Sequence, residues 1–265
     1  MSHNQVNAYD LDRHVAEIYD LHETKLDDVG LIRRLLGKSQ PIRILEPFCG
    51  TGRILFPLAL EGHTLHGIDQ SSAMLGRASL KIEQAAFEVQ GRVTLSHADV
   101  LHTDWPADFD LVVLGCNCFY ELATPDEQKS CIASASQALK RGGYLFIDND
   151  HMEGDLAPFW QDVGVIHPSL CGTCSDGTIV KGTRETLWFD APNRLVRFRR
   201  RTQVILPTGE VMEQEYVQQK HPVSKREVQI WLEQYGFVIE NIFGDYTGIP
   251  YTDSAPRAIF WARRV

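Results

Sequence analysis

The chain has 265 residues, of which 43% are hydrophobic and 23% charged, a composition typical of a folded protein with one sizeable core. Its formal net charge of −9 argues against binding a nucleic-acid backbone, where affinity comes largely from lysines and arginines. No apolar run approaches the roughly 18 residues of a membrane span. The first residues are polar and lack the apolar core of a signal peptide. We therefore expect a cytoplasmic protein that binds neither nucleic acid nor a membrane.

Residues 42–60 predict a strand, a glycine-containing loop and a helix in succession. An apolar run ends at Glu46, a tight turn follows around Gly50 and Gly52, and apolar residues then recur at helical spacing. Glycines let a backbone approach a ligand closely, and a helix start offers free N–H groups, so the loop suits a nucleoside-bearing cofactor. The spacing differs from the dinucleotide-binding Gly-x-Gly-x-x-Gly, and the loop lacks the lysine of a phosphate-binding loop.

Four further short apolar runs predict strands, each followed by polar residues: 64–68, 93–95, 111–114 and 144–147. Between the last two, Thr124 is the predicted cap of a helix, Pro125 its first residue, and Gly142-Gly143 its stop. Asp69, at the tip of the second strand, is placed to accept both hydroxyls of a ribose. This alternation predicts an α/β fold with a doubly wound parallel sheet, in which ligands bind outside the carboxyl ends of the strands.

The second half departs from this alternation through an insertion over residues 151–220. The five arginines between 194 and 201 are interrupted by apolar residues, which indicates a strand with one charged face rather than a nucleic-acid site. After the insertion, Ser224 and Glu227 predict a helix that begins with a capping box. We expect the insertion to form a small antiparallel layer over the carboxyl ends of the sheet, as a lid or as a dimer surface. Its predicted strands are 178–189, 195–206 and 211–219, with a hairpin turn at 207–210.

The six cysteines do not predict a metal site or disulfides. Cys171 and Cys174 have the spacing of zinc ligands, but a four-ligand site needs a second pair. Cys116 and Cys118 are only one residue apart and belong to the cofactor side of the predicted sheet. We therefore interpret Cys171 and Cys174 as part of a loop, and in a cytosolic protein structural disulfides are not expected.

Five segments together identify a family: EPFCGTGR (46–53), GIDQSSAML (67–75), HADV (97–100), DLVVLGCNCFYEL (110–122) and LKRGGYLFID (139–148). With them the chain resembles the class I S-adenosylmethionine-dependent methyltransferases over essentially its whole length, although Phe48 replaces the first glycine of the usual loop. AEIYD (16–20) and PYTDSAPRAIFWARR (250–264) are similar to small-molecule N-methyltransferases of the glycine and amino-sugar type. The resemblance implies one Rossmann-like domain over 1–265, with a seven-stranded, mostly parallel sheet closed by an antiparallel hairpin of 237–243 and 257–262.

The resemblance also implies that S-adenosylmethionine is the cofactor and that residues at the strand ends bind it. Glu46 would order the loop and the ammonium end, Asp69 would bind the ribose, and Asp99 would accept a hydrogen bond from the adenine amino group. Tyr19 either covers the methionine part or is an ordinary core aromatic. The predicted cofactor-binding residues are Tyr19, Glu46, Gly50, Gly52, Arg53, Asp69, Gln70, Met74, Asp99, Val100, Gly115 and Cys116.

Methyl transfer mainly requires a lone pair aligned behind the activated methyl carbon, and an amine must also lose a proton. Asn117 corresponds to a substrate-binding asparagine of glycine N-methyltransferases, whereas their substrate arginine after the fifth strand is absent and Asp150 stands near its position. Our hypothesis is an amine-bearing small molecule that is attracted by Glu121, Asp148 or Asp150, with His151 as the base. The predicted catalytic residues are Asn117, Tyr120, Glu121, Asp150 and His151.

Two other functions remain open on the sequence. The first is a nucleic-acid or protein methyltransferase, but DNA adenine enzymes carry prolines in an Asn-Pro-Pro-Tyr turn where residues 117–120 read Asn-Cys-Phe-Tyr. The second is a non-catalytic module that only binds the cofactor, against which the intact glycine loop, ribose and adenine positions argue. We expect a small-molecule substrate, and a homodimer if the insertion is a dimer surface.

Overall fold

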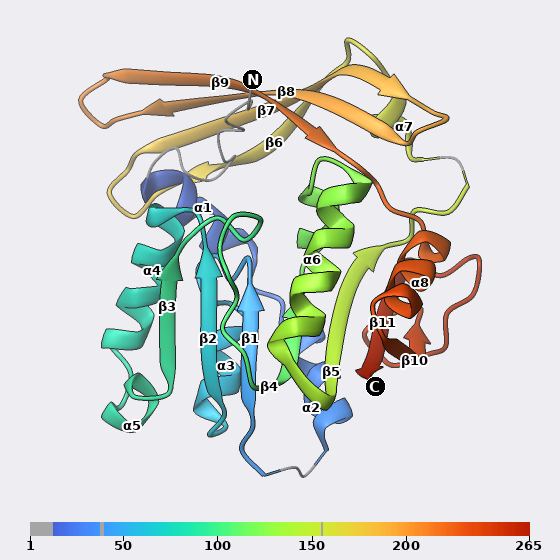
Figure 1. Ribbon diagram of the computed structural model, residues 1–265. Helices are drawn as coiled ribbons and strands as arrows, with labels where there is room; N and C mark the ends of the chain where they lie inside the picture. The colour runs from blue at the N-terminus through green and yellow to red at the C-terminus, as the bar shows by residue number, and fades with distance from the viewer. Residues whose placement is uncertain (1–12, 38–39, 155) are drawn as a thin grey trace.

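The computed structural model describes residues 13–37, 40–154 and 156–265, which form two β-sheets. A seven-stranded sheet, in the order β10-β11-β5-β4-β1-β2-β3, stands upright in Figure 1, and a four-stranded sheet, in the order β6-β7-β8-β9, lies across its top. The predicted fold class is thereby confirmed, including the antiparallel layer above a mostly parallel sheet. Most of the polar N-terminal stretch noted above, residues 1–12, lies outside the described residues.

Five parallel strands make up the centre of the larger sheet, and its last two strands close it as an antiparallel hairpin. The carboxyl ends of the parallel strands meet at one edge, beneath the four-stranded sheet (Figure 1). This edge is where a doubly wound sheet binds its ligands. The strands are β1 (Arg43–Pro47), β2 (Thr64–Asp69), β3 (Val93–His97), β4 (Phe109–Leu114), β5 (Leu139–Asp150), β10 (Phe237–Phe243) and β11 (Arg257–Arg264).

Alternate residues of the central strands pack into two hydrophobic cores on opposite faces of the sheet. Ile44 and Leu111 belong to the core with α2 and α3, whereas Leu45 and Val112 belong to the core with α6 and α8. Because both faces are covered, these strands are apolar almost throughout. The helices are α1 (Arg13–His22), α2 (Asp27–Leu36), α3 (Leu55–Leu60), α4 (Ser72–Glu83), α5 (Phe87–Gln90), η1 (Cys118–Glu121), α6 (Pro125–Ala138), α7 (Pro158–Gln161) and α8 (Lys225–Gln234).

Two predicted helix starts are confirmed by their caps. The Thr124 hydroxyl accepts a hydrogen bond from the Glu127 backbone N–H at 3.2 Å, with Pro125 as the first helical residue. Ser224 and the first turn of α8 form the predicted capping box. Within the part of the chain that the structure describes, no helix has the length and apolar character needed to cross a membrane.

The predicted stop of the helix before the fifth strand was wrong. α6 ends at Ala138, and β5 begins at Leu139, so Gly142 and Gly143 lie inside the strand. The pairing of β4 with β5 shifts register here, because Gly142 adopts a left-handed conformation with φ of 80°. A Cβ on Gly143 would lie 3.0 Å from the Lys140 carbonyl oxygen. The two glycines therefore form a bulge in the strand. In the sequence, such a glycine pair looks the same as the end of a helix.

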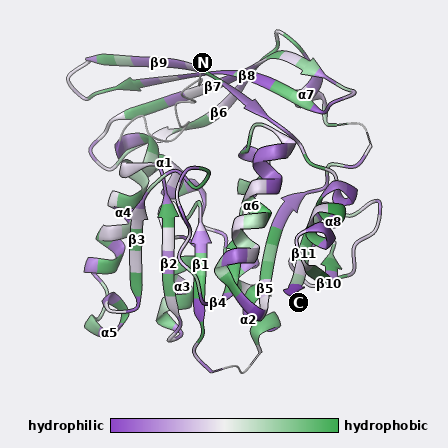
Figure 2. Cartoon of the chain, in the orientation of Figure 1, coloured by the Kyte–Doolittle hydropathy of each residue, from purple (hydrophilic) through white to green (hydrophobic). Residues whose placement is uncertain are grey.

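The insertion contains one strand that we had interpreted as a loop, β6 (Ile166–Thr173), which includes Cys171. Pro168 and Gly172 broke the sequence pattern, and the pairing of β6 with β7 does shift register between Pro168 and Cys171. The three predicted strands and the turn at 207–210 are confirmed. They are β7 (Ile179–Asp190), β8 (Leu195–Ile205) and β9 (Val211–Lys220), and hydrophilic residues cover much of β8 and β9 (Figure 2).

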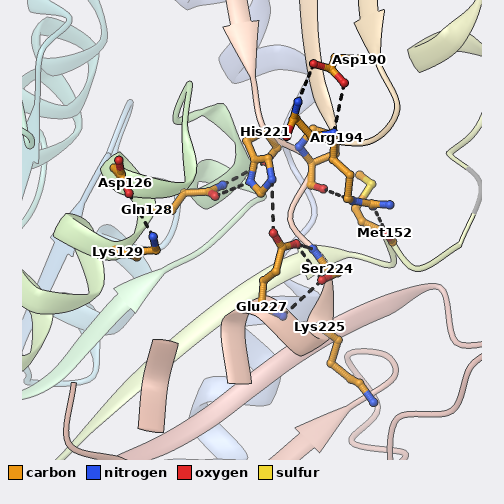
Figure 3. Close-up of polar contacts among 12 residues, drawn as sticks. Asp126, Gln128, Lys129, Met152, Asp190, Arg194, His221, Ser224, Lys225 and Glu227 are labelled. Atoms are coloured by element: carbon orange, nitrogen blue, oxygen red, sulfur yellow. Dashed lines mark hydrogen bonds and ion pairs between the residues drawn. The ribbon is translucent and has the colours of Figure 1, made fainter. Parts of the chain in front are cut away.

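A polar junction holds the end of the four-stranded sheet to the larger sheet (Figure 3). Buried Gln128 on α6 donates to the carbonyls of Phe119 and His221, both at 3.0 Å, and its oxygen lies 2.7 Å from His221 Nδ1. On the other side, Arg194 donates to the carbonyls of Met152 and Pro222. The junction holds the segment between β9 and α8, where the chain passes from the insertion back to the larger sheet.

Replacing Gln128 with leucine should lower the free energy of unfolding by about 2–4 kcal/mol, because two buried carbonyls and His221 lose their partner. Urea denaturation measures this change. Gln137→Leu is the matched control, since Gln137 is exposed on the same helix. Equal stability of the two variants would show that the junction contributes nothing.

Candidate active site

The glycine loop after β1 is held by Asp69 at the tip of β2. The Gly50 backbone N–H donates to one Asp69 oxygen at 2.8 Å, and the Ser71 N–H donates to the other at 2.8 Å. Phe48, Gly50 and Gly52 all have positive φ. The backbone is therefore left-handed at position 48 as well, where phenylalanine replaces the usual glycine. Asp69 therefore fixes the loop and the start of α4 together, at the position predicted for a ribose.

Glu46 is a buried acid with an unused oxygen. It is 5% exposed, and its Oε2 atom has no hydrogen-bond partner among the described residues. Burial raises the pKa of Glu46 well above its usual range, although Arg53 acts in the opposite direction. A buried carboxylate oxygen without a donor fits a cationic ligand group, such as an ammonium.

The first helix, α1, is fixed to the glycine loop by Asp20, a residue that the sequence analysis missed. The Asp20 carboxylate accepts hydrogen bonds from Thr51 at 2.7 Å, Lys81 at 2.6 Å and Arg77 at 3.2 Å. Burial opposes its ionisation, but these donors lower the pKa of Asp20. The contacts bring Tyr19, the preceding residue, to the same side of the loop, where it is half-buried. The only sign of Asp20 in the sequence was its position directly after the apolar residues of α1.

Arg53 is one of the predicted cofactor-binding residues. α3 begins at Leu55, and Arg53 lies in the turn before it. Its guanidinium binds both oxygens of buried Asp28 on α2, at 3.0 and 2.5 Å. Arg53 therefore ties the loop to α2. A hydrogen bond from Arg53 to a cofactor would have to come from a guanidinium N–H group that Asp28 does not use.

The residues predicted around the adenine lie at the adjoining tips of β2 and β3. Asp99 accepts from the Leu101 N–H at 2.9 Å, and its second oxygen lies 2.8 Å from His102 Nδ1. Met74 and Val100 are buried, whereas Gln70 is exposed and its carbonyl lies 2.9 Å from His97 Nε2. These four predicted residues thus follow the ends of the neighbouring strands β2 and β3. Asp69, at the end of β2, lies between them and the glycine loop.

The loop after β4 is strained and turns back onto β5. Gly115 packs so closely on Ile54 that a Cβ would lie 2.5 Å from the Ile54 Cδ1 atom. Cys116 and Asn117 follow with φ of 55° and 62°, and left-handed residues other than glycine are uncommon outside functional sites. The backbone N–H of Cys116 donates to the Asp148 carboxylate, and that of Asn117 to the Asp148 carbonyl.

Arg257 on β11 joins the two acids at the end of β5, and the sequence analysis missed it. Its guanidinium binds Asp148 at 2.6 Å, Asp150 at 2.5 Å and the Asn117 side-chain oxygen at 3.0 Å. Asp148 is fully buried and also accepts a hydrogen bond from Tyr246 at 2.9 Å. Its predicted role in attracting an amine is therefore not supported, since both of its oxygens are occupied.

Asp150 keeps one oxygen that faces the other predicted catalytic residues. Oδ2 accepts from the Tyr120 hydroxyl at 3.3 Å and from the Asn117 amide at 3.2 Å, and the side chain is 41% exposed. The Asp150 backbone N–H donates to the Asn117 oxygen at 2.7 Å. Asn117, Tyr120 and Asp150 thus converge as the sequence predicts.

Glu121 and His151 do not have the environments that we had expected. Glu121 forms an ion pair with buried Lys220 on β9 and accepts from Gln218 at 2.8 Å. Burial raises the pKa of Glu121, but Lys220 and Arg200 outweigh it, so the net shift is downward. His151 stacks on Tyr251, with Nδ1 3.0 Å from the Tyr251 hydroxyl. No contact within the described residues joins His151 to Asp150 or Tyr120, so its predicted role as the base is not supported.

Cys171 and Cys174 lie in different surroundings. Cys171 lies within β6, and its thiol donates to the Gly182 carbonyl at 3.4 Å. Cys174 lies beside His14 and Asp176, with potential ligand atoms of the three residues within 4.8 Å of one another. Its thiol donates to the His14 carbonyl at 3.5 Å, and Asp176 accepts from Thr178 at 2.9 Å. These contacts connect α1 with the four-stranded sheet.

Residues 44–143 match the family model of the methyltransferase domain, which covers the strands from β1 to the start of β5. A Geobacillus sp. (strain WCH70) protein named "Putative methyltransferase" is 24% identical over 231 residues, which cover 86% of this chain and 87% of that protein. Further curated relatives, several of them ubiquinone biosynthesis O-methyltransferases, are matched over 41–55% of their own length.

Solved structures share the fold through the insertion as well. A S-adenosylmethionine-dependent methyltransferase from Clostridium acetobutylicum has a TM-score of 0.71 at 17% identity, covering 93% of both chains. The sugar N-methyltransferase KedS8 from Streptoalloteichus sp. has a TM-score of 0.70 at 20% identity, covering 100% of this chain and 98% of that one. At these identities the likeness concerns the fold.

Replacing Lys220 with methionine should lower the free energy of unfolding by about 2 kcal/mol, because Glu121 loses its ion-pair partner while it stays largely buried. The double variant Lys220→Met, Glu121→Gln should recover at least part of this loss. Urea denaturation of the wild type, both single variants and the double variant gives the coupling energy. A coupling energy near zero would contradict the ion pair.

Proposed function

We propose that this S-adenosylmethionine-dependent methyltransferase transfers the methyl group to an amine of a small molecule. The acceptor would lie between the carboxyl end of the seven-stranded sheet and the four-stranded sheet. The observation that carries this proposal is the half-exposed side chain of Asp150, whose Oδ2 atom faces Tyr120 and Asn117 beside the strained loop after β4. The name of KedS8, a sugar N-methyltransferase, supports an amine in a small molecule.

The residues at the strand ends fit the cofactor. Glu46 Oε2 is a buried acceptor without a described partner, and it would take the ammonium of the methionine part. Asp69 would accept the ribose hydroxyls while it keeps its hydrogen bonds from Gly50 and Ser71. Asp99, half-exposed at the tip of β3, would accept from the adenine amino group, and α1 would close the site from above through the contacts of Asp20.

Bound S-adenosylmethionine supplies a methyl group on a sulfonium sulfur, which keeps the electron pair of the broken S–CH₃ bond and becomes a thioether. The lone pair of the acceptor nitrogen forms the new N–CH₃ bond, so the nitrogen must be neutral and aligned. We infer that Asp150 Oδ2 accepts the hydrogen bond of the amine and takes its proton, which then passes to water. Asn117 and Arg257 hold the Asp150 carboxylate in place for this task.

The four-stranded sheet would act as a lid on this reaction. Trp160, Val196 and Phe198 from the insertion belong to the same hydrophobic core as Leu114 and Ile147 of the larger sheet. A lid continuous with the core excludes water from the end of β4, where it would otherwise compete for the amine. A dimer surface is the alternative role of the insertion.

The affinity for S-adenosylmethionine should fall at least roughly 10-fold in Glu46→Gln, because the ammonium loses a charged acceptor. Free Glu46 has a raised pKa, so binding should release a proton in the wild type, and affinity should rise with pH until Glu46 is ionised in the free protein. Calorimetry in two buffers of different ionisation enthalpy detects the released proton, which should be missing in Glu46→Gln. The control is Glu88→Gln, an exposed residue of α5; wild-type affinity in Glu46→Gln would refute the assignment.

A metabolite screen tests the acceptor. Purified protein is incubated with S-adenosylmethionine and pooled metabolites, with the demethylated cofactor as the readout and mass spectrometry of the product to locate the methyl group. An N-methylated small molecule supports the proposal. An O- or S-methylated product, or transfer only to bulk nucleic acid or protein, overturns it.

With an amine acceptor in hand, Asp150→Asn should lower kcat by roughly 100-fold or more, the usual contribution of a positioned proton acceptor. The pH dependence of kcat should change as well, which a purely structural loss would not produce. Asp104→Asn, on an exposed residue with no described contact, is the control. Full turnover of Asp150→Asn would remove Asp150 from the mechanism.

A further inference from the structure

The inward face of the four-stranded sheet is basic. On β7, β8 and β9, register partners share a face, so Arg184 lies opposite Arg200, and Arg200 opposite Tyr216. Lys220 lies four residues after Tyr216 on β9, on the same face, and it reaches Glu121 on the larger sheet. This face therefore looks toward the predicted acceptor position rather than toward solvent.

Among the described residues, Arg184 forms no ion pair with an acid. Its guanidinium lies over the ring of Phe159 at 4.5 Å and over that of Phe198 at 4.9 Å, and it has no hydrogen bond or ion pair with any described residue. Burial and the neighbouring Arg200 lower the pKa of Arg184, although Tyr120 and Glu121 act in the opposite direction. A half-buried guanidinium of this kind is costly unless an anion completes it.

The outward face of the same strands shows the contrast. Arg199 pairs with Glu185 at 3.0 Å, and Arg201 pairs with Glu215 at 2.5 Å. Inward, by comparison, Glu121 pairs with Lys220 and also acts on Arg184 and Arg200, while Arg184 has no ion pair of its own among the described residues. This group of cations occurs in a chain whose net charge is −9, so it is a local feature and not a consequence of composition.

Tyr120 connects this basic face with the acidic end of the sheet. Lys220 Nζ lies 5.5 Å from the Tyr120 ring centroid, and the Tyr120 hydroxyl donates to Asp150 Oδ2 at 3.3 Å. Asp148 and Asp150 share one cation, Arg257, so the acidic end keeps an excess of negative charge. Tyr120 therefore has a cation over its ring and an acid at its hydroxyl.

We propose that the acceptor carries an oxyanion, a carboxylate or a phosphate, which binds to Arg184 and Arg200 under the four-stranded sheet while its amine lies at Asp150. The inference rests on the proposed function and names the class of its substrate. Arginine suits this role because its planar fork matches the two oxygens of either anion, and Arg200, which also donates to Gln218 at 2.9 Å, is oriented for it. The substrate class is thus an amino acid or an amine that bears a phosphate.

A binding experiment tests the anion site without turnover. The protein is saturated with the demethylated cofactor, S-adenosylhomocysteine, and titrated with malonate as the carboxylate probe and pyrophosphate as the phosphate probe. At least one of the two should bind to the wild type and bind roughly 10-fold or more weakly to Arg184→Met, since one charged hydrogen-bonding group is lost. Arg184→Lys, which keeps the charge but not the fork, should be intermediate. The tighter probe identifies the anion.

Arg201→Met is the matched control, because Arg201 follows Arg200 on β8 but points to the outward face. It should bind both probes as the wild type does. Equal binding to Arg184→Met and Arg201→Met, or no binding of either probe to the wild type, overturns the inference. Affinity for S-adenosylhomocysteine is measured in each variant, so that a folding defect is recognised as a loss of cofactor binding.

Kinetics separate this inference from the proposed function. With an N-methylated acceptor from the screen, Arg184→Met should raise KM roughly 10-fold while kcat changes little, because Arg184 would bind the anion and not the reacting nitrogen. An N-methylated acceptor without an anionic group would overturn the inference and leave the proposed function intact. Probe binding that depends on Arg184, together with an O-methylated product, would overturn the function and leave the anion site.

Discussion

The ion pairs of Arg257 are the interaction on which the candidate acceptor site depends. β11 lies antiparallel to β5 and pairs Arg257 with Asp150, which places the guanidinium between two acids and the Asn117 side chain. Asp148 is fully buried, and without a cation it would become protonated and could no longer hold the loop after β4. The antiparallel hairpin at the end of the chain thus has a direct part in shaping the site.

The larger sheet was predictable because its signals are local. Each parallel strand is a short apolar run that ends in polar residues, and the caps at Thr124 and Ser224 lie within three residues of their partners. Local signals also misled us. Two glycines that form a bulge looked like a helix stop, and β6 was hidden by Pro168 and Gly172.

The contacts within the candidate acceptor site were not predictable, because they join residues far apart in the sequence. Asp150 and Arg257 are separated by 107 positions, and Glu121 and Lys220 by 99. Sequence patterns show that an acid follows a strand but not which cation will reach it. For that reason the residue set Asn117, Tyr120 and Asp150 was found, whereas the partners that neutralise Asp148 and Glu121 were not.

The charge difference between the two sheets also has a consequence for molecules that should not react. A compound that entered in the reverse orientation would bring its cation against Arg184 and its anion against Asp150. Both ends would then meet like charges, and such repulsion is strong where the charged groups are partly buried. The side chains that would bind one orientation therefore disfavour the other. A compound with two anionic or two cationic groups would meet a like charge at one end in either orientation, so it would bind weakly.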